Sequence, residues 1–278
     1  MADVQDINFN TIDGYENIIL RLSVIIPTRN RADLLRKTLK SIALQTFPFD
    51  EFEVIVVDNG STDNTKQIVE NCINDIKNIR YLYDPIPGLH VGRHRGLKEA
   101  KAELLVYADD DIEAFPEWLE GVWESFRDSN VVLAGGKNLP KWETEPPYWI
   151  YEMWMDINDY GHSLWYLSIL DFGNEIIEID PGYVWGCNFS IRKKTLLEAK
   201  GFHPDGFPQD MIKYRGDGET SVSDYIRKKN YKTIYNPKAS VYHFVPKNRM
   251  TLDYFCKRAF NQGISDSYTE IRKKMTNV

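Results

Sequence analysis

Short apolar runs alternate with amphipathic stretches between residues 22 and 107 of the 278-residue chain. Each run is continuous and ends near a turn-forming residue, which is typical of a parallel strand buried on both faces. Between the runs, apolar residues recur at helical spacing, as Leu35, Leu39 and Ile42 do. This alternation predicts an α/β fold with a doubly wound, mostly parallel, Rossmann-like sheet and right-handed crossovers. The predicted strands are residues 22–27, 53–58, 79–83 and 103–107.

The helices of this first part are predicted from caps and stripes. Asn30 is expected to cap the first helix, because its side chain accepts hydrogen bonds from free helical N–H groups. Ile68, Cys72 and Ile76 form the apolar stripe of the second helix. Residues 91–101 are expected to form the third.

The pattern becomes less regular after residue 115. Residues 140–172 hold many aromatic residues and prolines, and they are too apolar to remain in water, so they predict a structured insertion. Their rings either pack internally or shape a binding site for sugar rings. The other predicted helices are residues 116–129, 193–200, 219–229 and 251–262, and the other strands are residues 131–134, 183–191, 232–236 and 239–244.

Composition limits the possible functions. The net charge of −7 and the sequence pI near 5.4 argue against a nucleic-acid binder, since such proteins usually present a basic field. The three cysteines are far apart and form no CxxC pair, which is typical of reduced, intracellular thiols. Neither a signal peptide nor a run of about 18 apolar residues is found, so we expect a cytoplasmic chain without a membrane span.

Polar groups follow three of the predicted strands. In an open α/β sheet, ligands bind beyond the carboxyl ends of the strands, so these groups are expected to converge in one crevice. No GxGxxG follows any strand, and a dinucleotide cofactor is therefore not indicated. The groups are Pro27-Thr28-Arg29-Asn30, Asp58-Asn59 and Asp109-Asp110-Asp111.

The three consecutive aspartates predict a metal site. Close, desolvated carboxylates repel one another, and a bound cation is the usual remedy. Because side chains alternate in an extended segment, Asp109 and Asp111 are expected on one side and Asp110 on the other. Oxygen ligands of this kind favour Mg²⁺ or Mn²⁺. A solvated acidic turn that caps the next helix is the simpler alternative.

Asp58 also has two interpretations. Its carboxylate could accept a hydrogen bond from a nucleobase N–H, which favours uracil or thymine. It could equally cap the turn of residues 58–63. Thr28 and Arg29 could line the nucleoside pocket beside it.

At this point the chain resembles glycosyltransferase family 2, whose members have the GT-A fold. The resemblance lies in residues 23–31 (Ser-Val-Ile-Ile-Pro-Thr-Arg-Asn-Arg), 54–65 and 108–112 (Ala-Asp-Asp-Asp-Ile). Residues 87–97 are similar to the family's loop and helix before the metal motif, with His94 where the family usually has Asn. The resemblance implies a donor site made of Pro27, Thr28, Arg29, Arg31, Asp58, Asn59, Arg93, Asp109 and Asp110.

The resemblance continues to residue 244. Residues 184–192 are similar to a family strand with a Gly-x-Asn core, and the implied acceptor contacts are Trp185, Gly186, Asn188 and Asp217. The register set by residues 231–243 puts Glu219 at the position of the family's catalytic base, with a carboxylate at a helix start as its structural alternative. His243 is implied as a metal ligand beside Asp109 and Asp111, or else as a structural histidine.

The resemblance also implies an organisation and an activity. We expect an arm (residues 1–21), a GT-A domain (22–250) with a nucleotide-sugar half (22–135) and an acceptor half (136–250), and a helical tail (251–278). The expected reaction is an inverting transfer, dependent on Mn²⁺ or Mg²⁺, from a UDP- or dTDP-sugar to a saccharide or lipid-linked saccharide. By analogy it serves polysaccharide or glycoconjugate synthesis at the inner face of a membrane.

Three questions stay open at this stage. The run Arg272-Lys273-Lys274 could touch an anionic membrane, with a solvated tail as the simpler interpretation. A sugar-phosphate nucleotidyltransferase is an alternative, but the first strand is not followed by a Gly-rich phosphate loop. A non-catalytic sugar-binding protein is another, against which Asp109, Asp111 and Glu219 argue. The sequence leaves the oligomeric state undefined.

Overall fold

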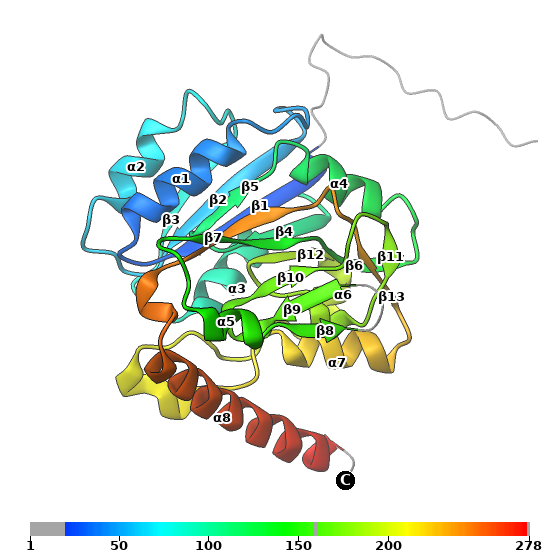
Figure 1. The fold of residues 1–278 in the computed structure, drawn as a ribbon. Helices are drawn as coiled ribbons and strands as arrows, with labels where there is room; N and C mark the ends of the chain where they lie inside the picture. The colour runs from blue at the N-terminus through cyan, green and yellow to red at the C-terminus, as the bar shows by residue number, and fades with distance from the viewer. Residues whose placement is uncertain (1–19, 158–160, 277–278) are drawn as a thin grey trace, which may run out of the picture.

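Two mixed β-sheets and eight labelled α-helices form the computed structural model, which describes residues 20–157 and 161–276 (Figure 1). Across the larger sheet the strands are β11 (Ile177–Glu178), β13 (Lys232–Tyr235), β6 (Val131–Gly135), β12 (Asn188–Arg192), β4 (Leu104–Ala108), β1 (Leu22–Thr28), β2 (Phe52–Asp58) and β3 (Ile79–Tyr83). Across the smaller sheet they are β5 (Ile112–Ala114), β14 (Val241–Val245), β7 (Asn138–Trp142), β10 (Ile169–Asp171), β9 (Gly161–Leu164) and β8 (Met155–Ile157).

The larger sheet is doubly wound, as predicted. Strands β3, β2, β1 and β4 are parallel, and every residue of β1 and β2 is buried. One face is covered by α1 (Ala32–Ile42), α2 (Thr65–Asn71) and α4 (Trp118–Ser125). The other is covered by α3 (Leu89–Glu99), α6 (Lys193–Glu198) and α7 (Thr220–Lys228). Continuous apolar runs are therefore explained by burial on both sides.

The second half departs from the parallel pattern. Strand β12 runs antiparallel to both of its neighbours, β4 and β6, so the sheet is mixed. This strand begins at Asn188 and not at residue 183 as predicted, because residues Pro181–Tyr183 form a 3₁₀ turn.

The aromatic segment builds most of the smaller sheet, which the sequence pattern did not predict. Its core contains Ile150, Leu164, Leu167 and Ile169, packed with partly buried tryptophans. The helices next to it are α5 (Tyr148–Glu152) and α8 (Leu252–Thr276). They contact each other through Trp149 and Phe255, whose ring centroids are 5.0 Å apart. Part of the apolar surface of this segment is thus used for packing, while Tyr148, Tyr151, Met153 and Met155 are exposed.

Among the helices, the ends of α8 and α2 and the cap of α1 differ most from the predictions. Helix α8 continues to Thr276 and not to residue 262. Helix α2 ends at Asn71, short of Ile76. Asn30 does not cap α1: it has a positive φ of 53°, and its side chain accepts from Thr62 N–H. The carboxylate of Asp63 accepts from Ala32 N–H instead, so the cap comes from a loop distant in sequence.

Residues 1–19 of the predicted arm and residues 277–278 of the predicted tail lie outside the described residues. Among the residues described, no helix combines the length and the apolar character needed to cross a bilayer.

Candidate functional site

The aspartate triplet connects the two sheets. Strand β4 of the larger sheet ends at Ala108, and β5 of the smaller sheet begins at Ile112. Strand β14 pairs antiparallel with β5, and this register places His243 opposite Ile112. A hydrogen bond of 2.9 Å from Phe244 N–H to the carbonyl of Asp111 fixes the junction. Backbone pairing therefore brings His243 beside the aspartates.

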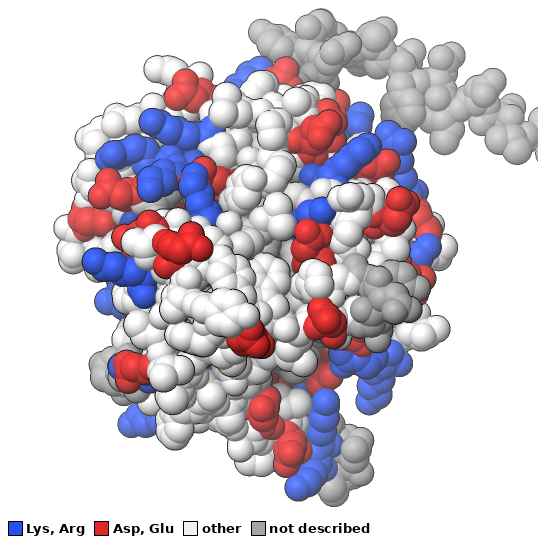
Figure 2. Space-filling model, viewed as in Figure 1, with Lys and Arg blue, Asp and Glu red and all other residues white. Residues whose placement is uncertain are grey.

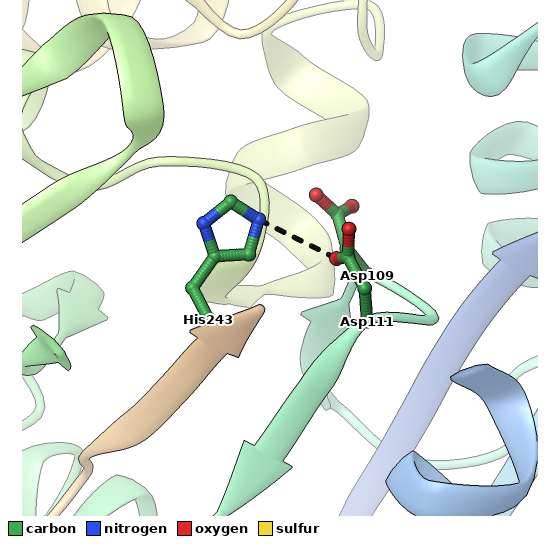
Figure 3. A group of neighbouring side chains, drawn as sticks. All are labelled: Asp109, Asp111 and His243. Carbon is green, nitrogen blue, oxygen red and sulfur yellow. Dashed lines mark ion pairs between the residues drawn. The ribbon is translucent and has the colours of Figure 1, made fainter. Parts of the chain in front are cut away.

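Asp109, Asp111 and His243 form a compact group of possible metal ligands (Figure 3). One ligand atom from each lies within 4.8 Å of the others. His243 Nδ1 is 2.9 Å from the carbonyl oxygen of Leu167, which can only accept, so Nδ1 carries the proton. In the neutral ring Nε2 then presents its lone pair toward Asp111, as a metal-ligating histidine does.

An unsatisfied oxygen tests whether a cation fits this group. Asp111 Oδ1 is buried and accepts no hydrogen bond within the described chain. It lies 3.4 Å from His243 Nε2, the contact drawn in Figure 3. Two acceptors facing each other in a buried place are poorly matched without a positive charge between them. The residues present therefore fit a divalent cation with oxygen and imidazole ligands.

Asp110 has a different environment from its two neighbours. Its carboxylate accepts a hydrogen bond of 2.7 Å from Thr28 and pairs with Arg31 at 2.6 Å. Arg31 also reaches Asp111 Oδ2 at 2.6 Å. Both carboxylate oxygens of Asp110 therefore have partners other than His243. These contacts with Thr28 and Arg31 stabilise the turn between β4 and β5. Asp110 and Asp111 form a turn between β4 and β5, so this division of the carboxylates comes from the turn and not from the expected extended segment.

A first cleft of about 480 Å³ lies at the ends of β1, β2 and β4. From the predicted donor site it is lined by Pro27, Thr28, Arg29, Arg31, Asn59, Asp109 and Asp110, and it also contains Gly88, Leu89, Gly206, Phe207, Pro208 and Arg249. Arg249 was not among the residues expected at the site. Its guanidinium is 3.5 Å from Asp111 Oδ2, so it adds positive charge beside the metal group.

Arg93 connects the metal group to Glu219. It is only 2% exposed, pairs with Glu219 Oε1 at 2.9 Å and lies 3.7 Å from Asp109 Oδ1. Burial opposes ionisation of Glu219, but the Arg93 guanidinium holds the pKa of this carboxyl below its usual value. Burial raises the pKa of Asp109, although Arg93 opposes the shift. Arg93 thus orders both carboxylates and is not itself part of the first cleft.

Gly186 makes room for this ion pair. A Cβ added there would overlap Arg93 Nη2 and Glu219 Oε1. Any larger residue would therefore displace the Arg93–Glu219 pair. This close contact explains why the first residue of the Gly-x-Asn segment is a glycine.

A second cleft of about 610 Å³ adjoins the first and shares Leu89, Asp109 and Gly206 with it. Glu219 lies in its lining together with Trp165, Tyr183, Trp185 and Gly186. Arg258, Gln262 and Ser265 of α8 complete one wall. The second cleft is therefore aromatic on one side and polar on the other.

Three predicted site residues are engaged in internal contacts. Asn188 lies in neither cleft: it accepts from Trp118 Nε1 and donates to the carbonyl of Ala239. This corrects the expectation of an acceptor contact, because both ends of its amide are used in the core. The carboxylate of Asp58 accepts from Ser61 N–H and Tyr81 Oη and also lies outside both clefts, as its turn-capping interpretation requires.

Asp217 borders the second cleft, but its carboxylate is fully covered. It accepts from His203, Thr269 and Arg272, the last two on α8. Asp217 thus anchors α8 rather than offering free oxygens to an acceptor. His94, where the chain departs from the family pattern, also has an internal partner: its Nε2 accepts from Phe202 N–H at 2.9 Å.

The profile of glycosyl transferase family 2 matches residues 23–199, which is more than half of the chain. The chain belongs to this family. The predicted resemblance is confirmed, and membership removes the reason to consider a sugar-phosphate nucleotidyltransferase.

Two curated relatives of the chain are informative. A GalNAc(5)-diNAcBac-PP-undecaprenol beta-1,3-glucosyltransferase of Campylobacter jejuni is 40% identical over 195 residues, covering 66% of this chain and 55% of that protein. A glucosyl-dolichyl phosphate glucuronosyltransferase of Haloferax volcanii is 23% identical over 254 residues, covering 88% and 76%. The matched segments cover 38%, 24%, 22% and 55% of the length of four curated relatives.

Solved structures share the fold. Mannosyltransferase PcManGT from Pyrobaculum calidifontis, in complex with GDP-Man and Mn²⁺, aligns with a TM-score of 0.57 and 22% identity over 82% of this chain and 58% of its own. TarS of S. aureus, residues 1–349 in complex with UDP-GlcNAc, aligns with a TM-score of 0.56 and 21% identity over 81% and 59%. The α/β fold of the GT-A type, expected from the sequence, is thereby confirmed.

Proposed function

We propose that the chain is an inverting, metal-dependent glycosyltransferase that moves a sugar from a UDP- or dTDP-sugar to a hydroxyl group of a lipid-linked saccharide. One observation carries the proposal. The two clefts meet at Asp109, with the Asp109–Asp111–His243 group on one side and Glu219, held by Arg93, on the other. A donor phosphate and an acceptor hydroxyl need such adjacent but different surroundings.

The first cleft suits the donor. Its arginines, Arg29, Arg31 and Arg249, supply positive charge for a diphosphate, and Asn59 adds an amide to the wall. Mn²⁺ or Mg²⁺ bound by Asp109, Asp111 and His243 would supply further positive charge where negative charge develops on the leaving diphosphate. The proposed organisation assigns this cleft mainly to residues 22–135, and the second half contributes residues 206–208 and Arg249.

The second cleft suits the acceptor and contains the proposed base. Glu219 accepts the proton of the acceptor hydroxyl while that oxygen forms a bond to the anomeric carbon. The bond from this carbon to the nucleoside diphosphate breaks on the opposite face, and the diphosphate leaves with the electron pair. The lowered pKa of Glu219 keeps the carboxylate ionised and ready to accept the proton. Trp185 offers an aromatic face to a sugar ring.

The class of acceptor is suggested by the relatives. Two of them are named for lipid-linked substrates, one with undecaprenol and one with dolichyl phosphate. The UDP-GlcNAc of the TarS complex supports a uridine nucleotide, and the GDP-Man of PcManGT makes guanosine the first competitor. A role in polysaccharide or glycoconjugate synthesis follows from these substrates.

The test is a donor and acceptor panel with the full chain. Release of nucleoside diphosphate is measured for UDP-, dTDP- and GDP-sugars with Mn²⁺, Mg²⁺ or EDTA, with and without undecaprenyl-diphosphate saccharides. We expect metal-dependent release that the acceptor accelerates, and a product of inverted anomeric configuration. If no donor gives metal-dependent release, the non-catalytic sugar-binding interpretation replaces this proposal.

A further inference from the structure

Eight charged side chains line the second cleft, and seven of them have an ion-pair partner among the described residues. The seven are Arg93, Asp109, Asp205, Arg215, Asp217, Glu219 and Arg227. The eighth is Arg258 of α8, which makes no hydrogen bond and no ion pair to any described residue. A guanidinium without a partner in the protein is free to bind an anion that enters the cleft.

Helix α8 holds Arg258 in place. Phe255, three residues before it, packs against Trp149 with ring centroids 5.0 Å apart. Ser265, two turns after it, donates a hydrogen bond of 3.0 Å to the carbonyl of Gly216. Arg258 lies half-buried between these two contacts. Because the helix is fixed on both sides, only the side chain of Arg258 has to be ordered when a ligand binds.

The basic run near the end of α8 differs from Arg258. Arg272 pairs with Asp217 and Asp224, and Lys273 also pairs with Asp224. Two of the three cations for which a membrane contact was expected from the sequence are thus engaged within the chain. They attach the helix to the rest of the molecule, whereas Arg258 does not contribute to this attachment.

The remainder of the surface offers little general attraction for an anion. The chain has a net charge of −7. On the described residues of the face drawn in Figure 2, Lys and Arg are interspersed with Asp and Glu, and no broad basic area is seen. An anion in the second cleft therefore depends on local positive charge, and Arg258 supplies it.

Arg258 also lies near the proposed base. Burial opposes ionisation of Glu219, the Arg93 guanidinium is the main cause of its lowered pKa, and the charge of Arg258 adds to the lowering. Charges interact appreciably only over short distances. An anion bound by Arg258 and a hydroxyl group that gives its proton to Glu219 would therefore belong to neighbouring parts of one acceptor.

We propose that Arg258 binds the phosphate group that joins the sugar of the acceptor to its lipid. A guanidinium presents parallel N–H donors that match phosphate oxygens, and its charge strengthens these hydrogen bonds. In a sugar phosphate the phosphate is attached to the ring that carries the hydroxyl groups, which agrees with the nearness of Arg258 to Glu219. The inference rests on the proposed function and deepens it, since it selects an acceptor whose reactive hydroxyl is close to the phosphate.

Calorimetric titration of the full chain with geranyl phosphate tests the proposal without requiring the acceptor sugar to be known. Saturating UDP and Mn²⁺ keep the phosphate out of the first cleft. We expect Arg258→Gln to weaken binding of geranyl phosphate about tenfold or more, because a charge-assisted hydrogen bond is lost. Arg258→Lys should recover part of the affinity, since it keeps the charge but not the paired donors.

Lys257→Gln is the matched control on the same helix. Lys257 is exposed, pairs with Asp253 at 2.7 Å and lines neither cleft, so its removal should not alter the affinity for geranyl phosphate. Equal losses in the two variants would overturn the proposal. So would equal affinity of the unaltered chain for geraniol, which has no phosphate. Equally tight, Arg258-dependent binding of geranic acid would assign the residue to a carboxylate and contradict the phosphate assignment.

Kinetics separate a contact with phosphate from an effect through Glu219. For Arg258→Gln we expect KM to rise about tenfold more for an alkyl-diphosphate saccharide than for the neutral alkyl glycoside of the same saccharide. An effect through Glu219 would instead lower kcat for both acceptors alike, and this result would contradict the inference. Arg258-dependent binding of geranyl phosphate without transfer to any acceptor would contradict the proposed function alone.

Discussion

The two clefts are built in opposite ways, although they share a wall. The first lies at the ends of parallel strands, and most of its polar residues belong to three short segments that directly follow β1, β2 and β4. The second is lined by residues of α3, the smaller sheet, the segment 182–187 before β12, α7 and α8. Arg93 and Glu219, the pair at its centre, are 126 residues apart in the sequence.

The two clefts also differ in the chemistry of the side chains that line them. The first cleft combines arginines with acidic residues, which suits a phosphate group and a cation. The second combines Glu219 and other polar side chains with aromatic rings, which suits a sugar and the removal of a proton. If this division is correct, substitutions in one cleft should alter donor and metal binding and substitutions in the other should alter turnover or acceptor binding.

The largest expected effect is on turnover, from Glu219→Gln. The amide retains the size of the side chain but accepts no proton, so kcat should fall by about 10³-fold. Donor affinity should change little, because Glu219 lies outside the first cleft. Steady-state transfer and calorimetric donor binding measure the two quantities. Glu198→Gln, on α6, is the matched control, and near-normal turnover in Glu219→Gln would remove this residue from the mechanism.

The next largest effect is expected on the affinity for Mn²⁺, in the variant Asp111→Asn. Loss of a charged ligand should weaken Mn²⁺ binding by at least about 100-fold, since even the loss of an outer partner commonly costs 10- to 100-fold. Asp110→Asn is the sharpest comparison, because Asp110 is engaged by Thr28 and Arg31 and faces away from His243. Titration with Mn²⁺ should show the smaller loss for Asp110→Asn. Equal losses would contradict the assignment of separate roles.

Gly186→Ala should disturb the second cleft without removing any polar group. The added methyl group must displace Arg93 or Glu219, and a misplaced catalytic group costs about 10- to 100-fold in turnover. Gly263→Ala, on α8, is the control: nothing lies within 4 Å of the added Cβ, so stability should change by no more than about 1 kcal/mol. Thermal unfolding separates a loss of activity from a loss of folding. Normal turnover in Gly186→Ala would argue that the Arg93–Glu219 geometry is unimportant.

The smallest effect is expected from Trp185→Ala. An aromatic face contributes about 1 kcal/mol to packing on a ring, so the acceptor KM should rise by up to about tenfold. Donor release in the absence of acceptor should be unchanged, since Trp185 lies only in the second cleft. A change in donor affinity in place of acceptor KM would show that the two clefts are not divided as proposed.

The comparison also explains which features were predictable from the sequence. The parallel strands follow from continuous apolar runs, and the polar residues at their ends follow from the strand boundaries. Both signals are local. The family motifs added Glu219 and His243, whose positions depend on backbone pairing far from the aspartates in sequence.

Other features depended on contacts that no local pattern encodes. Arg249 reaches Asp111 only because β14 pairs with β5 and the chain then turns back. The smaller sheet forms from short strands without regular alternation, and α8 extends past residue 262 because Thr269 and Arg272 are held by Asp217. Asn188 matches a family position, but both ends of its side-chain amide form hydrogen bonds with Trp118 and Ala239.

The central claim is that the first cleft binds a nucleoside diphosphate through a cation held by Asp109, Asp111 and His243. Isothermal titration calorimetry of UDP against the full chain, with Mn²⁺ and with EDTA, tests it most directly. We expect UDP to bind at least about tenfold more tightly with Mn²⁺, and Asp111→Asn to lose this difference. The same UDP affinity in Mn²⁺ and in EDTA would contradict the claim.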